Sequence, residues 1–193
     1  MNPSRTFPVA IESKVQPFSL ARAKLDGVEL VIWKGSSGKI HVWEDTCPHR
    51  STRLSAGRNL GDQLEDVYHG WRFAENGTLS LIPAARKTER PDISVRVLAS
   101  SVSGGFVWAT LNDEPQPDPN FNGLPLRPIH CKAPAKVVNA RLSAVTALNL
   151  IVTPWSETES MIFGVTDRFD KAGLRVADRQ LVKLLRNVER AVQ

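Results

Sequence analysis

The 193-residue sequence predicts a mainly β protein, an antiparallel β-sandwich or barrel followed by a shorter segment that combines strands with a helix. Short runs rich in β-branched and aromatic residues recur through the first two-thirds of the chain, and Gly, Pro, Asn or Asp bounds each run. Many short strands at close spacing are typical of a small sandwich or barrel. An amphipathic pattern near the C-terminus predicts the helix.

The expected strands follow one another along the first two-thirds of the chain. The first pair, 28–33 and 39–44, is rich in Val, Ile and Trp and flanks a glycine-bearing hairpin turn at 34–38. The later candidates are bounded by turn-forming residues and cover 64–69, 78–82, 94–98 and 105–111. Together these strands form the predicted sandwich.

A proline-rich stretch at 113–119 separates this region from the rest of the chain. Its alternate prolines fix an extended backbone that can join no sheet, which is typical of a linker. We therefore place a domain at 1–115, a linker at 116–130 and a second segment at 131–193.

The second segment is expected to contain two strands and a helix. Apolar runs predict strands at 140–152 and 161–165. From Ala172 onward, apolar residues at steps of three and four predict an amphipathic helix, whose stripe is Leu174, Ala177, Leu181, Leu184, Val188 and Val192. This stripe needs a surface to cover it, either on another subunit or on the chain's own sheet.

The charge pattern argues against a nucleic-acid partner. The formal net charge is +5 and the sequence pI is about 9.5, with basic residues concentrated at 86–90 and 175–190. A nucleic-acid surface would interleave basic residues with aromatic platforms, and 175–190 contains no aromatic residue. We expect solvated faces there, or a docking surface for an acidic protein.

The cysteines and the N-terminus indicate the compartment. Cys47 and Cys131 lie far apart without a disulfide-like spacing, which favours a reducing environment and hence the cytoplasm. Residues 1–10 are polar and interrupted by proline, unlike a secretory signal, and no stretch approaches the roughly 20 apolar residues of a membrane span. We expect no membrane association.

Two short motifs carry the chemistry. Cys47 and His49 are separated by one residue, and His69 follows later, ahead of Gly70 and Trp71. A Rieske centre holds its iron–sulfur cluster with two loops, each giving one cysteine and one histidine. Cys47 and His49 complete the pair expected of the first loop, and His69 matches the histidine of the second.

A longer series makes the pattern specific. In chain order it comprises residues 47–50, Leu54, Ser55, Gly57, residues 68–71, Phe73, Gly77, residues 82–84 and residues 105–108. With its fitting gaps, this series resembles the Rieske domain of the large subunits of ring-hydroxylating and demethylating oxygenases, over roughly 28–115. The resemblance implies a Rieske-type β-sandwich and a [2Fe–2S] cluster bound by Cys47, His49, His69 and the residue at position 66.

Position 66 departs from the family pattern, which has cysteine three residues before the second histidine. Asp66 keeps the negative charge of a thiolate but offers a hard oxygen with little covalency toward iron. Three outcomes are open: Asp66 ligates a more labile [2Fe–2S] cluster, the four residues hold a single Fe or Zn ion, or the site is empty and kept for its shape. Cys131 is a conceivable replacement thiolate, although it lies beyond the linker.

The chain lacks the family's second iron site. In oxygenases of this kind, a further domain supplies two histidines and a carboxylate to a catalytic mononuclear iron. With His49 and His69 assigned to the loops, only His41 and His130 remain of the four histidines, and no helix pattern such as His-x4-His exists. The stretch 151–169 nevertheless resembles the closing sheet of that domain, so the chain resembles a large subunit without the middle of its catalytic domain.

These features favour an accessory subunit of a Rieske oxygenase system, which relays electrons or fills a place in the assembly. Its expected partners are a full-length oxygenase subunit or a redox protein, in a hetero- or homo-oligomer. We expect no catalytic residue in the chain and no substrate oxidation by the chain alone. The alternatives are a free-standing ferredoxin-like carrier, which would not need the C-terminal segment, and a cluster-free degenerate scaffold.

Overall fold

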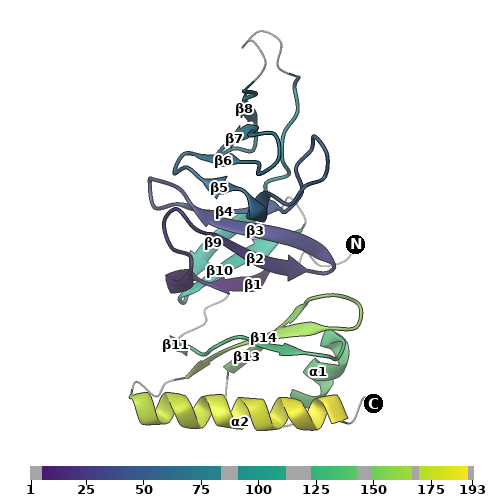
Figure 1. The fold of residues 1–193 in the computed structure, drawn as a ribbon. Coiled ribbons are helices and arrows are strands. Elements are labelled where there is room, and N and C mark those ends of the chain that lie inside the picture. Colours follow the sequence, from purple (N-terminus) through teal and green to yellow (C-terminus); the bar gives the residue numbers. More distant parts are fainter. Residues whose placement is uncertain (1–5, 84–90, 112–122, 143–148, 167–169, 191–193) are drawn as a thin grey trace.

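The computed structural model describes residues 6–83, 91–111, 123–142, 149–166 and 170–190. Short antiparallel strands dominate these ranges, and two α-helices lie in the C-terminal part (Figure 1). The N-terminal strands are β1 (Thr6–Ile11), β2 (Leu20–Leu25), β3 (Val28–Lys34), β4 (Ile40–Glu44), β5 (Arg58–Asn59), β6 (Gln63–Glu65), β7 (Arg72–Ala74), β8 (Leu79–Leu81), β9 (Ala99–Ser103) and β10 (Phe106–Thr110). Two 3₁₀ turns, Glu12–Lys14 and Leu54–Ala56, join them. The mainly β class is confirmed.

The C-terminal part contains the remaining elements, which form one sheet and two helices. They are β11 (Leu124–Pro125), β12 (Ile129–Cys131), α1 (Ala135–Leu142), β13 (Asn149–Pro154), β14 (Ser160–Thr166) and α2 (Lys171–Arg190). β13 pairs with one edge of β14, while β11 and β12 pair with successive stretches of its other edge. Residues 124–125 and 129–130 of the linker expected at 116–130 therefore belong to a sheet, and the proline-rich stretch 113–119 lies outside the described residues.

The sheets are stacked in layers, which Figure 1 shows from the top of the molecule to α2 at the base. The sheet β5–β6–β7–β8 lies uppermost, the sheets β2–β3–β4 and β1–β10–β9 lie below it, and the C-terminal sheet lies next to α2. Alternate residues of β3 face opposite layers, as the two-residue period of a strand requires. Leu30 and Ile32 join the core shared with β10, whereas Val31 and Trp33 join the core beneath the uppermost sheet.

Strand β10 also places alternate residues on opposite faces. Val107 and Ala109 face β3, while Phe106 and Trp108 pack against Phe163 and Val165 of β14. Backbone contacts strengthen the junction, since Asp26 donates to the Pro154 carbonyl at 2.7 Å. The two parts of the chain therefore share an apolar cluster at the junction of β10 and β14.

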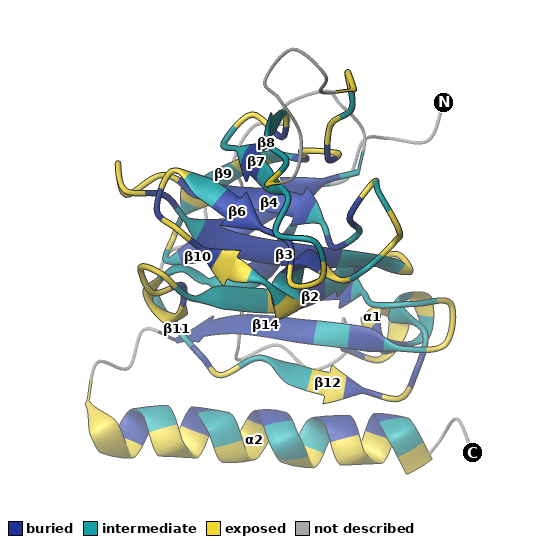
Figure 2. Ribbon diagram, turned by 45° about the horizontal axis from the view of Figure 1, so that its top comes forward, coloured by how far each residue is buried: buried dark blue, intermediate teal, exposed yellow. Residues whose placement is uncertain are grey.

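Helix α2 covers the outer face of the C-terminal sheet. Its buried residues face the sheet and its exposed residues face outward, as Figure 2 shows by colour. Those buried residues are Gly173, Ala177, Leu181, Leu185 and Val188. The predicted amphipathic helix is confirmed, and the chain's own sheet covers the described part of its apolar stripe, while Val192 lies outside the described residues. None of the helices in the described ranges is long and apolar enough to span a membrane.

Some expected element boundaries are wrong. Of the strand expected at 140–152, residues 140–142 belong to α1 and 149–152 belong to β13, while 143–148 lie outside the described residues. The strand expected at 94–98 consists of isolated bridges at Ser94 and Val97. The strand expected at 64–69 ends at Glu65, because the chain turns there to form the loop with His69. Strands β1 and β2 had no counterpart among the expected elements.

Candidate metal centre at the tip of the sandwich

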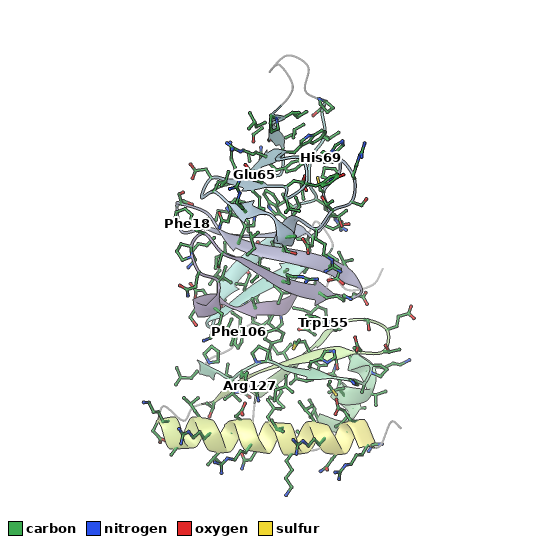
Figure 3. The ribbon with its side chains drawn as sticks, viewed as in Figure 1. Phe18, Glu65, His69, Phe106, Arg127 and Trp155 are labelled. Atoms are coloured by element: carbon green, nitrogen blue, oxygen red, sulfur yellow. The ribbon has the colours of Figure 1, made fainter. Side chains whose placement is uncertain are left out.

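Two loops meet at the tip of the molecule that is farthest from α2, where Figure 3 labels His69. The first loop, 45–53, follows β4, and the second, 66–71, joins β6 to β7. Asp45 fixes the first loop, because its carboxylate accepts hydrogen bonds from the backbone N–H and the hydroxyl of Ser55, each at 2.6 Å. The second loop closes on itself through the Asp66 N–H, which donates to the Trp71 carbonyl at 2.8 Å.

The structure brings the two motif histidines together across the loops. The Nδ1 atoms of His49 and His69 lie 3.1 Å apart. His49 stacks on Trp71 with a centroid distance of 4.0 Å and an interplanar angle of 5°, and Tyr68 meets the His69 ring edge-on at 4.2 Å. Burial, the neighbouring His69 and Arg50 lower the pKa of His49, which favours the neutral imidazole.

Asp66 joins the two loops through hydrogen bonds. Its side chain is fully buried, and Oδ1 accepts a hydrogen bond from the Thr52 hydroxyl of the first loop at 2.6 Å. Oδ2 accepts the backbone N–H groups of Tyr68 at 3.3 Å and His69 at 2.8 Å. Such side-chain bonds to the following backbone are typical of an Asp-initiated turn. Both carboxylate oxygens are therefore already engaged within the protein.

Cys47 and Cys131 lie in different layers. Cys47 is fully buried in the core below the tip, together with Trp43, Leu54 and Leu64, and burial raises the pKa of its thiol. Cys131 lies on β12 in the core between the C-terminal sheet and α2, where burial raises the pKa of its thiol to about 11. Cys131 is thus placed at the opposite end of the layered fold from the two loops.

A buried carboxylate beside the site was missed in the sequence. Glu65 accepts hydrogen bonds from Arg58 and from Arg72, the latter at 2.8 Å, and the bond from Arg58 contributes most to lowering its pKa. Figure 3 places Glu65 just below the tip. Arg58, Glu65 and Arg72 are seven residues apart in sequence and lie opposite one another on β5, β6 and β7. This alternation of opposite charges on successive short strands is the signal that could have identified the group.

The other two histidines lie away from the tip. His41 is buried and stacks on Trp33 with a ring-centroid distance of 4.6 Å, and its burial lowers its pKa. His130 lies on β12 of the C-terminal sheet, with Nε2 3.5 Å from a carboxylate oxygen of Glu159. The two residues belong to different layers and do not form a pair.

The donor set can be tested against the cluster that the motifs imply. Two imidazole nitrogens on one tetrahedral metal, at about 2.05 Å each, would lie about 3.3 Å apart, so His49 and His69 fit the histidine half. The other half lacks a second thiolate, and the Asp66 oxygens are engaged by Thr52 and the loop backbone. Across the described ranges, no three His, Cys, Asp or Glu residues gather as a set that could hold a metal ion. The four residues together therefore do not fit a Rieske cluster.

Comparisons with known proteins identify the fold. A family model described as the Rieske [2Fe-2S] domain matches residues 5–99. The oxidoreductase NdmD of Pseudomonas putida is 37% identical over 112 residues, which cover 56% of this chain and 19% of NdmD. The oxygenase subunit of phthalate 4,5-dioxygenase from Pseudomonas putida is 32% identical over 95 residues, covering 48% of this chain and 22% of that protein. The chain thus spans about a fifth of the length of these curated relatives.

Solved structures resemble the chain over nearly its whole length. Apo dicamba monooxygenase superposes with a TM-score of 0.78 at 15% identity, covering 98% of this chain and 84% of that one. NdmA of Pseudomonas putida CBB5 superposes with a TM-score of 0.72 at 18% identity, covering 97% and 79%. At these identities the similarity concerns the fold alone. Residues 5–99 therefore form a Rieske [2Fe-2S] domain, and homologous domains occur in the subunits of Rieske oxygenases.

Proposed function

We propose that this chain is an accessory component of a Rieske oxygenase system, one that contributes a subunit fold to the assembly. The observation that carries the proposal is the shared core between the Rieske domain and the C-terminal sheet. Phe106 and Trp108 are fully buried against Phe163 and Val165. A free-standing ferredoxin-like carrier would need no such sheet, and its removal would expose these aromatic rings to water.

The histidines support an accessory role over an independent oxygenase. A mononuclear iron that activates oxygen takes two histidines and a carboxylate from the protein. His49 and His69 are used at the tip, while His41 and His130 lie in separate layers and complete the four histidines of the sequence. We therefore expect the purified chain to show no substrate oxidation by itself.

Assembly is tested with full-length Rieske oxygenase subunits from the same organism. The chain is co-expressed with each of them, and the products are analysed by size-exclusion light scattering and by reconstituted turnover. We expect a hetero-oligomer. A chain that stays free of every such subunit, or that oxidises substrate alone, contradicts the proposal.

The free-standing carrier is tested by deleting residues 123–193. We expect the truncated chain to aggregate or lose its cooperative unfolding transition, because the Phe106 face of β10 loses its cover. A truncated chain that remains monomeric and unfolds as before would favour the carrier. The control is a deletion of 191–193 alone.

Electron relay is a second candidate, which the 3.1 Å separation of the His49 and His69 nitrogens favours. It requires a cluster, so iron and acid-labile sulfide are measured in anaerobically purified protein together with the EPR spectrum of its reduced form. We expect little sulfide in the native chain and a gain in Asp66→Cys, which restores the soft donor. Asp66→Asn, similar in shape but without a thiolate, is the matched control. Stoichiometric sulfide in the native chain would favour the relay.

The location in the cell is also a proposal. Cys47 and Cys131 are both buried and unpaired in the structure. Free thiols support a reducing compartment such as the cytoplasm.

A further inference from the structure

The imidazole pair at the tip has the geometry of a small metal site of its own. His49 and His69 present their Nδ1 atoms to each other at 3.1 Å, and their ring centroids are 4.3 Å apart at an angle of 61°. Without a metal, this distance suits a hydrogen bond from one ring nitrogen to the other. The same distance is also close to the separation of two nitrogen ligands on one tetrahedral ion.

Neighbouring residues hold this pair in place through ring contacts and hydrogen bonds. The stacking of His49 on Trp71 orients one ring, and the edge of Tyr68 against His69 orients the other. Asp66 fixes the backbone that carries His69, because the carboxylate accepts the N–H of His69 at 2.8 Å and the hydroxyl of Thr52 at 2.6 Å. Pre-organised ligands lower the ordering cost that a metal ion would otherwise meet.

The surroundings decide which kind of ion suits the pair. The Asp66 Oδ2 atom lies 3.9 Å from Nδ1 of His69 and is engaged by backbone N–H groups. The His69 side chain retains 27% of its exposure, so water can reach the ring. Imidazole nitrogens suit the borderline divalent ions, whose affinity rises from Co²⁺ through Ni²⁺ to Cu²⁺. The site thus offers two nitrogen ligands and open positions for water.

We propose that His49 and His69 bind a single divalent transition-metal ion through their Nδ1 atoms, in place of a [2Fe–2S] cluster, with water completing the coordination shell. Asp66 is a positioning residue for this site and contributes no bond to the metal. The proposal does not depend on the accessory role. It would give the Rieske tip a mononuclear centre accessible from solvent.

The test is metal binding by the full-length chain after treatment with a chelator. Ni²⁺ is titrated calorimetrically and Co²⁺ by its visible spectrum. We expect one ion per chain, a spectrum without an intense thiolate-to-cobalt band, and an affinity that falls at least about tenfold in both His49→Gln and His69→Gln. His130→Gln is the matched control for a surface histidine beside a carboxylate and should bind as the native chain does.

Two further variants separate the roles of the neighbours. Cys47→Ser should retain Ni²⁺ binding, and Asp66→Asn should weaken it less than either histidine variant while it accelerates hydrogen exchange at the Tyr68 and His69 amides. Unfolding curves of every variant show that the chain is folded. Loss of binding in Cys47→Ser, unchanged binding in both folded histidine variants, or iron and sulfide in equal amounts in the native chain would overturn the proposal.

Discussion

The tip and the base of the molecule are held together by different forces. At the tip, carboxylates organise the loops: Asp45, Glu65 and Asp66 are each buried and each accepts at least two hydrogen bonds. At the base, apolar rings such as Phe106 and Phe163 meet edge-on at 5.8 Å. Directional bonds fix the positions of particular atoms, whereas apolar contacts supply most of the stability of a fold.

The tip therefore sets the positions of particular side chains, whereas the base supplies most of the stability of the fold. The second loop, which carries one of the two imidazoles, exposes the side chains of Val67 and Tyr68. The base provides layers of buried side chains that continue from α2 to β3. Changes at the base should therefore lower the free energy of unfolding, and changes at the tip should alter local order while they leave global stability nearly intact.

The largest expected effect is that of Phe163→Ala in β14. The ring is buried and contacts Phe106, so its removal leaves a cavity between the two parts of the chain. We expect the free energy of unfolding to fall by about 3–5 kcal/mol in urea denaturation. Tyr68→Ala, an exposed aromatic at the tip, is the control and should change it by less than about 0.5 kcal/mol. Equal losses in both variants would erase the distinction between tip and base.

Helix α2 gives the next largest effect. Leu181 is fully buried against the sheet, so Leu181→Ala should lower the free energy of unfolding by about 2–5 kcal/mol. Val176, an exposed apolar residue of the same helix, provides the control Val176→Ala. If Leu181→Ala left stability unchanged but dissociated a complex, the apolar stripe would serve a partner and not the chain's own sheet.

At the tip, Thr52→Val removes the hydroxyl that bridges the loops to Asp66. A hydrogen bond to a charged group contributes about 1.5–3 kcal/mol to stability. Part of the stability lost with this bond should be confined to the loops. We expect faster hydrogen exchange at the Tyr68 and His69 amides, with a smaller change in global unfolding than Leu181→Ala produces. Thr52→Ser keeps the hydroxyl and should exchange as the native chain does. Exchange in Thr52→Val that matches the native rate would show that the bridge does not order the loops.

The sequence allowed individual elements to be predicted in both regions, but not the contacts that join them. The Cys47, His49 and His69 spacing follows from cluster chemistry, and the Val31 and Trp33 strand follows from local composition. The base depends on contacts distant in sequence, such as Thr153 donating to the Pro8 carbonyl at 2.8 Å. No local pattern reveals such a pairing, and β1, interrupted by proline, carries a weak strand signal.

The function of Asp66 illustrates a second limit. The resemblance to the Rieske family indicated that Asp66 stands at the position of the second cysteine ligand. Whether its oxygens face a metal or the loop backbone depends on Thr52, fourteen residues away, whose hydroxyl occupies Oδ1. That choice is made by three-dimensional packing, and one sequence does not contain a signal for it.

The smallest expected effect concerns His41, which lies between the tip and the base. Burial lowers its pKa, opposed by Glu75, whose carboxylate oxygen is 3.5 Å from Nε2; Lys39 lowers it further. Because the folded pKa lies below the ordinary value of 6.5, the unfolded chain binds more protons. Stability from neutral His41 should therefore be present above pH 6.5 and be lost as the pH falls through 6.5 toward the folded pKa.

The measurement is the free energy of unfolding between pH 5 and pH 8, compared between the native chain and His41→Phe, which keeps a ring to stack on Trp33. We expect the difference between the two profiles to shift in favour of His41→Phe as the pH falls. In a chain that keeps His41, Glu75→Gln should increase the loss of unfolding free energy as the pH falls, since it removes the charge that stabilises the imidazolium. If the native chain instead gains stability on acidification relative to His41→Phe, the ion pair with Glu75 outweighs burial at this position. A polar interaction would then contribute to stability at His41 as polar interactions do at the tip.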